Sequence, residues 1–182
     1  MTAPDLDRWI AAPGVRVAHR REATADADAL WEAARSVRLQ ETPRLGRLIR
    51  WRIAGVSRDM AYDELFRRPP MIALEESELA LVCGLCGRIW KVREPFPRLS
   101  DPAEFRDWAA AGTVRVLYAN WVEAAGDGRA ALVSETRVAP VDRQGRLGLL
   151  AVRPLIRAFH YLIASEPLKV AVRRAEARQP QA

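Results

Sequence analysis

Residues 113–125 and 130–141 are two β-type segments joined by Gly126-Asp127-Gly128, and this pairing constrains the possible folds strongly. Glycine tolerates positive φ, so the short link predicts a tight hairpin between antiparallel strands. The last quarter of the chain repeats apolar residues every three or four positions, which predicts one long helix. Earlier strand-type segments cover residues 15–23, 71–77, 79–85 and 87–92.

Two short helices are predicted between the first strand and the later ones. Thr24 or Asp26 can cap the first helix, because their side-chain oxygens accept from the N–H groups of the first turn. Pro43 opens the second helix, which ends near Gly55. The predicted fold class is therefore α+β, in which a curved antiparallel sheet of about six or seven strands wraps around the C-terminal helix.

The C-terminal helix is predicted between roughly residues 143 and 177, with one apolar stripe covering the sheet. Pro154 and Pro167 should each kink or break this helix, because proline removes a backbone donor. The stripe consists of Leu147, Leu150, Ala151, Pro154, Leu155, Ala158, Phe159 and Leu162.

The chain has 182 residues and 49% hydrophobic residues, which predicts one globular domain. We expect an irregular lead-in over residues 1–13, a single domain over residues 14–177 and a tail over residues 178–182. The longest nearly uncharged apolar run, Leu79 to Cys86, is too short for a membrane span, and the acidic N-terminus has no secretory pattern. The expected compartment is the cytoplasm.

The net charge is +6, which raises the possibility of an anionic partner such as nucleic acid. However, 27 of the 29 basic residues are arginine, alanine is abundant too, with 31 residues, and the basic residues are spread along the chain. This pattern is typical of a GC-rich coding sequence, so no nucleic-acid partner is predicted.

Three stretches resemble the START-like SRPBCC superfamily of the birch pollen allergen and polyketide cyclases, and within it an uncharacterised bacterial branch. They are residues 23–31, with Leu30-Trp31; residues 78–90, with the glycines at 84 and 87; and Ser134-Glu135-Thr136-Arg137-Val138. Together with the element order, the resemblance spans about residues 14–177. It implies the helix-grip fold, and its motifs are structural signatures that specify no chemistry.

A sheet gripping a helix leaves space between them, and that space is a natural cavity for an apolar ligand. Strand alternation places Val116, Tyr118 and Asn120 on one face, which we assign to the inside. Arg88 can hold an anionic or carbonyl oxygen of a ligand, although it can equally reach solvent, and Trp90 can be ordinary core. The predicted ligand-binding residues are Arg88, Trp90, Val116, Tyr118, Asn120, Thr136, Phe159 and His160.

Glu135 and Arg137 share the opposite face of their strand, so we expect an outer-face ion ladder of little individual energy. If the faces are reversed, Glu135 becomes a candidate catalytic carboxylate. Cys83 and Cys86 lie three apart in a strand, so their sulfurs should diverge, whereas a tight hairpin at Gly84-Leu85 would bring them together. They lack adequate partners for a zinc site, and no phosphate-binding loop is present, so no metal and no cofactor are predicted.

Two functions fit these observations. The first is non-enzymatic binding of a small hydrophobic molecule, such as a lipid or a polyketide-like aromatic compound. The alternative is a cyclase/dehydratase-type enzyme in which Arg88, Tyr118 or His160 handles protons and oxyanions. Few titratable residues converge in the sequence, which favours binding, and no catalytic residue is assigned. The oligomeric state and the ligand's identity stay open.

Overall fold

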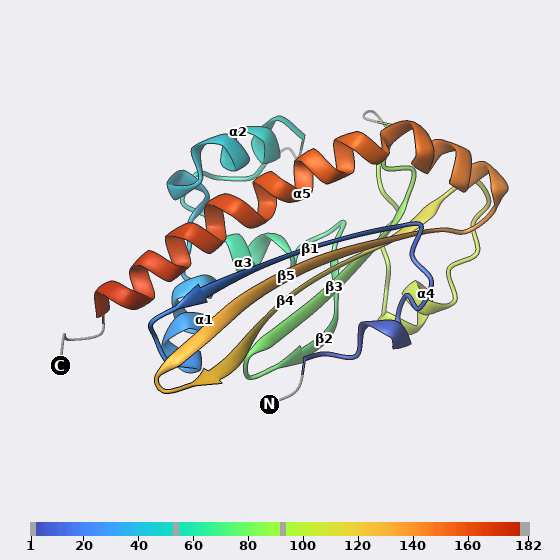
Figure 1. The fold of residues 1–182 in the computed structure, drawn as a ribbon. Helices are drawn as coiled ribbons and strands as arrows, with labels where there is room; N and C mark the ends of the chain where they lie inside the picture. The colour runs from blue at the N-terminus through green and yellow to red at the C-terminus, as the bar shows by residue number, and fades with distance from the viewer. Residues whose placement is uncertain (1–2, 53–54, 92–93, 179–182) are drawn as a thin grey trace.

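The computed structural model describes residues 3–52, 55–91 and 94–178, and the side chains of residues 52, 160 and 162–164 fall outside that description. One antiparallel sheet of five strands has the order β1-β5-β4-β3-β2 (Figure 1). The strands are β1 (Val15–Ala23), β2 (Ile72–Ser77), β3 (Ala80–Gly87), β4 (Val114–Gly126) and β5 (Arg129–Pro140). The helices are η1 (Leu6–Arg8), α1 (Ala27–Arg35), η2 (Leu39–Glu41), α2 (Pro43–Arg52), α3 (Tyr62–Leu65), α4 (Pro102–Arg106) and α5 (Arg143–Arg178).

The expected α+β helix-grip arrangement is confirmed, including two helices directly after the first strand. Asp26 caps α1, since its side chain accepts from the Ala29 N–H at 2.7 Å. The hairpin of β4 and β5 turns at Asp127, which has φ of +51° between two glycines of positive φ. The long helix α5 runs along the sheet with α2 beside it (Figure 1).

The sheet has fewer strands than the six or seven expected, because the segment 87–92 is not a separate strand. Its strand ladder ends at Gly87, which has φ of +141°. The Lys91 N–H then donates to the Arg88 carbonyl at 3.0 Å, closing a turn. Val92 lies outside the described residues, and Arg88 and Trp90 therefore sit in a turn rather than on a strand face.

The expected apolar stripe of α5 faces solvent over much of its length, which corrects the sequence prediction. Leu147, Leu150 and Leu155 are 63%, 54% and 68% exposed. The helix instead turns Gly145 toward the end of the loop before β4 and Gly148 toward the turn after β3. A Cβ at Gly145 would collide with the Thr113 carbonyl, and a Cβ at Gly148 would overlap the Trp90 ring. Small residues let the helix come close to the sheet, so the glycines set which face packs inward.

Sheet-facing apolar residues of α5 lie beside these glycines. Leu149 is buried against Val114 and Val138, and Ile156 packs against the same cluster. Neither Pro154 nor Pro167 interrupts α5. At Pro154 the helix is exposed, so water can reach the carbonyl that lacks its usual donor. Further along, Leu168, Ala171 and Val172 bury against α1 and the sheet.

Among the described residues, none of the helices combines the length and the apolar character needed to cross a membrane.

Candidate functional site

The inner face of the sheet carries the side chains that strand alternation assigns to it. Tyr118 and Val122 of β4 are buried together with Leu132 of β5 and Leu168 of α5. The opposite face of β4 buries different residues, which pack against the N-terminal segment and α4. The predicted orientation of the two central strands is therefore confirmed, and the face of Tyr118 is the one that the helices cover.

A small group of polar side chains lies within this apolar interior, and we call Tyr62, Tyr118, Asn120 and Ser134 the Tyr118 cluster. The hydroxyls of Tyr62 and Tyr118 lie 2.7 Å apart. Ser134 donates its hydroxyl to the Tyr118 oxygen at 3.1 Å, across the pair of central strands. Buried hydroxyls are stable in an apolar interior only with such partners. Tyr62 comes from α3, in a segment whose sequence has no clear periodicity, so sequence reasoning missed it.

Burial controls the protonation of the Tyr118 cluster. It raises the pKa of Tyr118 to about 12, although hydrogen bonds from Ser134, Tyr62 and Asn120 lower it. Burial also raises the pKa of Tyr62 well above its ordinary value, with Tyr118 adding to the effect. Both phenols therefore stay protonated at neutral pH, and they offer hydrogen bonds to a polar atom without acting as bases.

Little open space accompanies the Tyr118 cluster. A cavity of about 20 Å³ lies beside it, which is room for about one water molecule. The Oδ1 atom of Asn120 is buried and has no hydrogen-bond partner among the described residues. The cavity is lined by Trp31, Ala34, Arg35, Tyr62, Asp63, Asn120, Leu132, Pro167 and Leu168.

A larger hollow lies at the other end of the interface between the sheet and α5, where the turn after β3 meets the first turns of α5. It has a volume of about 350 Å³, within the usual range for small-molecule sites. We call it the Arg88–Trp90 hollow. Its lining consists of Arg88, Trp90, Lys91, Gly112, Gln144, Leu147 and Gly148.

The Arg88–Trp90 hollow combines an apolar wall with positive charge. Trp90 packs into the cluster that contains Val116 and Leu149, so one side of the hollow continues the inner core. Arg88 Nη1 and Lys91 Nζ each lie 3.1 Å from a carboxylate oxygen of Glu94. These cations lower the pKa of Glu94, with the hydrogen bond from Lys91 as the largest cause.

Arg88 is held in place by the loop before β4. Its Nε donates to the Gly112 carbonyl at 3.2 Å, and its Nη2 approaches the Ala111 carbonyl at 3.4 Å. Gly112 has φ of +68° and donates its N–H to Asp142 at 2.9 Å. The guanidinium is therefore oriented by backbone groups rather than left to solvent.

The residues predicted to bind a ligand divide between these two places. Arg88 and Trp90 line the Arg88–Trp90 hollow, with Val116 in the cluster behind Trp90. Tyr118 and Asn120 belong to the Tyr118 cluster. Thr136 pairs with Tyr118 across the sheet, Phe159 packs against the core around Tyr118, and the side chain of His160 lies outside the described residues.

Five lining residues of the hollow were missed from the sequence. They come together only because α5 begins beside the turn after β3 and the loop before β4, and they are Lys91, Gly112, Gln144, Leu147 and Gly148. A single sequence carries no signal for that juxtaposition.

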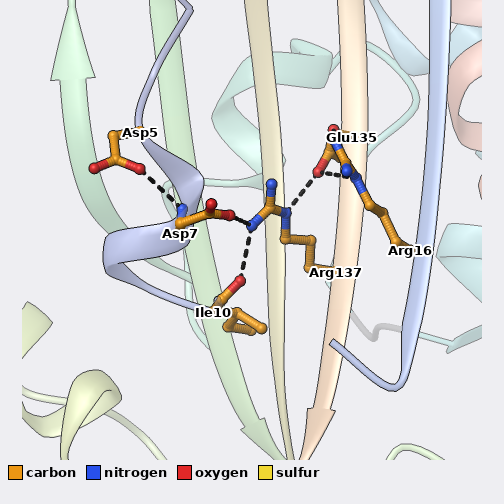
Figure 2. Close-up of polar contacts among 6 residues, drawn as sticks. All are labelled: Asp5, Asp7, Ile10, Arg16, Glu135 and Arg137. Carbon is orange, nitrogen blue, oxygen red and sulfur yellow. Dashed lines mark hydrogen bonds and ion pairs between the residues drawn. The ribbon is translucent and has the colours of Figure 1, made fainter. Parts of the chain in front are cut away.

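Glu135 and Arg137 lie on the outer face, as predicted, but they are buried rather than an exposed ladder. Their exposed fractions are 3% and 6%. Figure 2 shows Arg137 between Glu135 on one side and Asp7 and the Ile10 carbonyl on the other. Because η1 and the residues after it cover this face, the Arg137–Glu135 pair is shielded from water, whereas the side chains of Asp7 and Arg16 are 69% and 61% exposed. This position away from α5 also argues against Glu135 as a catalytic group of the inner site.

Cys83 and Cys86 lie on opposite faces of β3, as the spacing predicts. Cys83 is buried among the residues around Tyr118, and Cys86 among those around Phe105. Burial raises the pKa of each thiol to about 12. Within the described residues, no group of three or more His, Cys, Asp or Glu side chains is arranged to hold a metal ion.

The strand order, the two helices after β1 and the long helix laid over the sheet now define the architecture. The chain has a helix-grip fold. No protein-family model matches the sequence, and no curated protein matches it. Similar solved structures include norcoclaurine synthase from Thalictrum flavum in complex with dopamine and hydroxybenzaldehyde, at 12% identity and a TM-score of 0.45, covering all of this chain and 97% of that one.

Two further structures have comparable similarity. The ZhuI aromatase/cyclase from Streptomyces sp. R1128 is 17% identical with a TM-score of 0.40, covering 90% of this chain and 94% of that one. A hypothetical protein from Helicobacter pylori is 10% identical with a TM-score of 0.43, covering 96% and 99%. These likenesses concern the fold and nothing beyond it. At such TM-scores they carry no argument about activity, which must come from the site itself.

Proposed function

We propose that this protein binds a small, largely apolar molecule carrying a carboxylate or carbonyl oxygen in the Arg88–Trp90 hollow. The proposal rests on one observation: a space of about 350 Å³ is bordered both by the Trp90 indole and by two cationic side chains. Burial of ligand carbon against Trp90 and Leu147 would supply most of the affinity, at roughly 25 cal/mol per Å² of apolar surface.

The cations would orient the ligand. Arg88 and Lys91 already share one carboxylate, that of Glu94, so the geometry suits an oxygen anion between them. A ligand carboxylate or sulfonate would compete with Glu94 for these two groups. Backbone carbonyls hold Arg88 in place before binding, which lowers the entropic cost of ordering its side chain.

Binding is better supported than the cyclase/dehydratase alternative. The interior phenols of Tyr62 and Tyr118 stay protonated at neutral pH, so they are donors rather than bases. Asp63 at the small cavity is engaged by Arg67 at 3.0 Å and lies 3.7 Å from Arg35. We therefore assign no reaction, and the ligand's polar group is the only chemistry that the proposal specifies.

The test is titration with 8-anilinonaphthalene-1-sulfonate, a fluorescent molecule with an aromatic body and one anionic group. The wild-type protein should bind it with enhanced fluorescence, and excess decanoate should displace it. Arg88→Gln should weaken binding about tenfold, since a hydrogen bond to a charged group contributes about 1.5–3 kcal/mol. Arg115→Gln is the matched control, because it removes the same charge from β4. There the Arg115 guanidinium donates to the Arg106 carbonyl, outside the hollow.

Two steric variants locate the probe. Gly148→Ala places a Cβ where the Trp90 ring lies, and Val116→Trp adds a large ring to the cluster against which Trp90 packs. Both substitutions should displace Trp90 and reduce binding strongly. Circular dichroism will establish that each variant is folded. Unchanged affinity in folded Arg88→Gln and Gly148→Ala proteins would show that the hollow is not the binding site.

A further inference from the structure

The outward face of α5 is apolar where a surface helix is normally polar. Leu147, Leu150, Leu155 and Tyr161 are each more than half exposed. Positions 147, 150, 154, 158 and 161 follow one another at spacings of three or four, so they form one continuous strip along the helix. A contiguous exposed apolar strip of this kind marks an interaction surface.

Arginines border this strip. Arg146, Arg153 and Arg157 are exposed. Arg146 and Arg153 lie four and three residues from Leu150, and Arg157 lies three residues after Pro154. Arg143 adds a fourth positive charge at the start of the helix. Residues 143–165 contain no aspartate or glutamate, so this part of α5 is positive without internal compensation.

The neighbouring helix α2 has the same character. Trp51 is 71% exposed, and Arg44 and Arg47 are exposed on the same helix. Residues 43–58 also lack acidic residues. α2 lies beside α5 (Figure 1), and the Leu45 N–H donates to Glu166 of α5 at 3.0 Å. The two helices therefore present leucine, tyrosine, tryptophan and arginine from adjacent elements.

We propose that this α2–α5 surface docks onto the face of an anionic lipid bilayer. Helices that lie in the membrane interface combine a leucine- and aromatic-rich face with flanking arginines, as here. Phosphate headgroups complement the arginine border, while the leucines reach the acyl boundary. Pairing with a second copy of this chain through the same face would bring arginine against arginine with no acidic partner, so self-association fits less well.

The proposal is independent of ligand binding, although Leu147 lines the Arg88–Trp90 hollow as well as the exposed strip. Vesicle binding is measured without any added ligand, so a failure of the hollow and a failure of the surface are distinguishable.

The test is cosedimentation with vesicles of phosphatidylcholine alone or mixed with phosphatidylglycerol. The wild-type protein should bind the mixed vesicles, and added salt should weaken that binding. Arg153→Glu with Arg157→Glu should reduce the partition coefficient between vesicles and buffer at least tenfold. Each arginine near an anionic membrane surface contributes an attraction on the order of one RT or more, and each glutamate adds repulsion. Leu150→Ser with Leu155→Ser should also reduce it, because the apolar contribution is lost.

The matched control is Arg173→Glu with Arg178→Glu, which reverses two exposed charges near the other end of α5 and should leave binding close to wild type. Absence of binding to the mixed vesicles at low salt would overturn the proposal. So would equal loss in the control variant, or a wild-type dimer that Leu150→Ser with Leu155→Ser converts to a monomer. Binding to DNA or RNA without binding to vesicles would likewise assign the surface to a different partner.

Discussion

Replacing Arg137 with leucine should strongly destabilise the protein, because Arg137 supports a buried carboxylate. Its Nε donates to Glu135 at 2.6 Å, its Nη1 donates to the Ile10 carbonyl at 2.8 Å, and it pairs with Asp7 (Figure 2). Without Arg137, the ion-pair partner left to Glu135 among the described residues is Arg16, whose side chain is 61% exposed. Removing one partner of a buried ion pair costs about 3–5 kcal/mol, and the remaining Arg16 contact places the expected cost near 3 kcal/mol.

The double variant Glu135→Leu with Arg137→Leu should be more stable than Arg137→Leu alone. It leaves no buried carboxylate unpaired, since Asp7 is exposed, and it adds apolar surface on a face that η1 already covers, so its cost should fall to about 1 kcal/mol. Arg129→Leu is the control, because its ion pair with Glu22 is exposed on both sides and its loss should leave the stability close to that of the wild type.

Equilibrium unfolding in urea, followed by tryptophan fluorescence, measures these free energies. For a chain of this length, a loss of about 3 kcal/mol corresponds to a fall in Tm of roughly 6–12 °C. A cost of Arg137→Leu below about 1 kcal/mol would refute the reasoning, as would a double variant no more stable than the single one. Either result would mean that the N-terminal segment does not shield this network from water.

Three further predictions concern the core. Gly84→Ala should cost about 1–3 kcal/mol by thermal unfolding, since the new Cβ would lie 2.6 Å from the ring of Phe105; an unchanged Tm would contradict this packing. The thiols of Cys83 and Cys86 should react with a disulfide reagent at pH 8 only after urea is added, because burial keeps them protonated and covered. The folded pKa values of Cys83, Cys86 and Tyr118, each about 12, exceed the unfolded values of about 9 for the thiols and about 10 for the phenol. The stability that these three groups contribute should therefore be constant below about pH 8 and decline between about pH 9 and 12; a flat alkaline profile would count against this burial.

The sequence predicts the elements and the faces of the central strands well, because each of those features depends on local periodicity. The alternation through Val116, Tyr118 and Asn120 fixes which residues share a face, and Gly126-Asp127-Gly128 fixes the hairpin. The diverging sulfurs of Cys83 and Cys86 follow from the same rule.

The orientation of α5 could not be read from its apolar residues. The prediction assigned the leucine stripe to the sheet, whereas close approach to Trp90 and Thr113 selects the face of Gly145 and Gly148. The burial of Glu135 was also missed, since it depends on the path of a lead-in segment that has no regular pattern. Both errors arise from contacts between segments far apart in the sequence.

The candidate site was only partly accessible for the same reason. Arg88 and Trp90 were named for their chemistry, although they lie in a turn and not on the expected strand. Tyr62 and Gln144 join their sites through tertiary packing alone.

The measurement that tests the central proposal most directly is a ¹H–¹⁵N NMR titration of the wild-type protein with decanoate. Binding in the Arg88–Trp90 hollow predicts saturable shifts at the Gly112, Gln144 and Gly148 amides and at the Trp90 indole N–H, while the Gly128 amide in the distant hairpin stays constant. Shifts confined to the amides around Tyr118 and Asn120, or no saturable shifts at all, would contradict it.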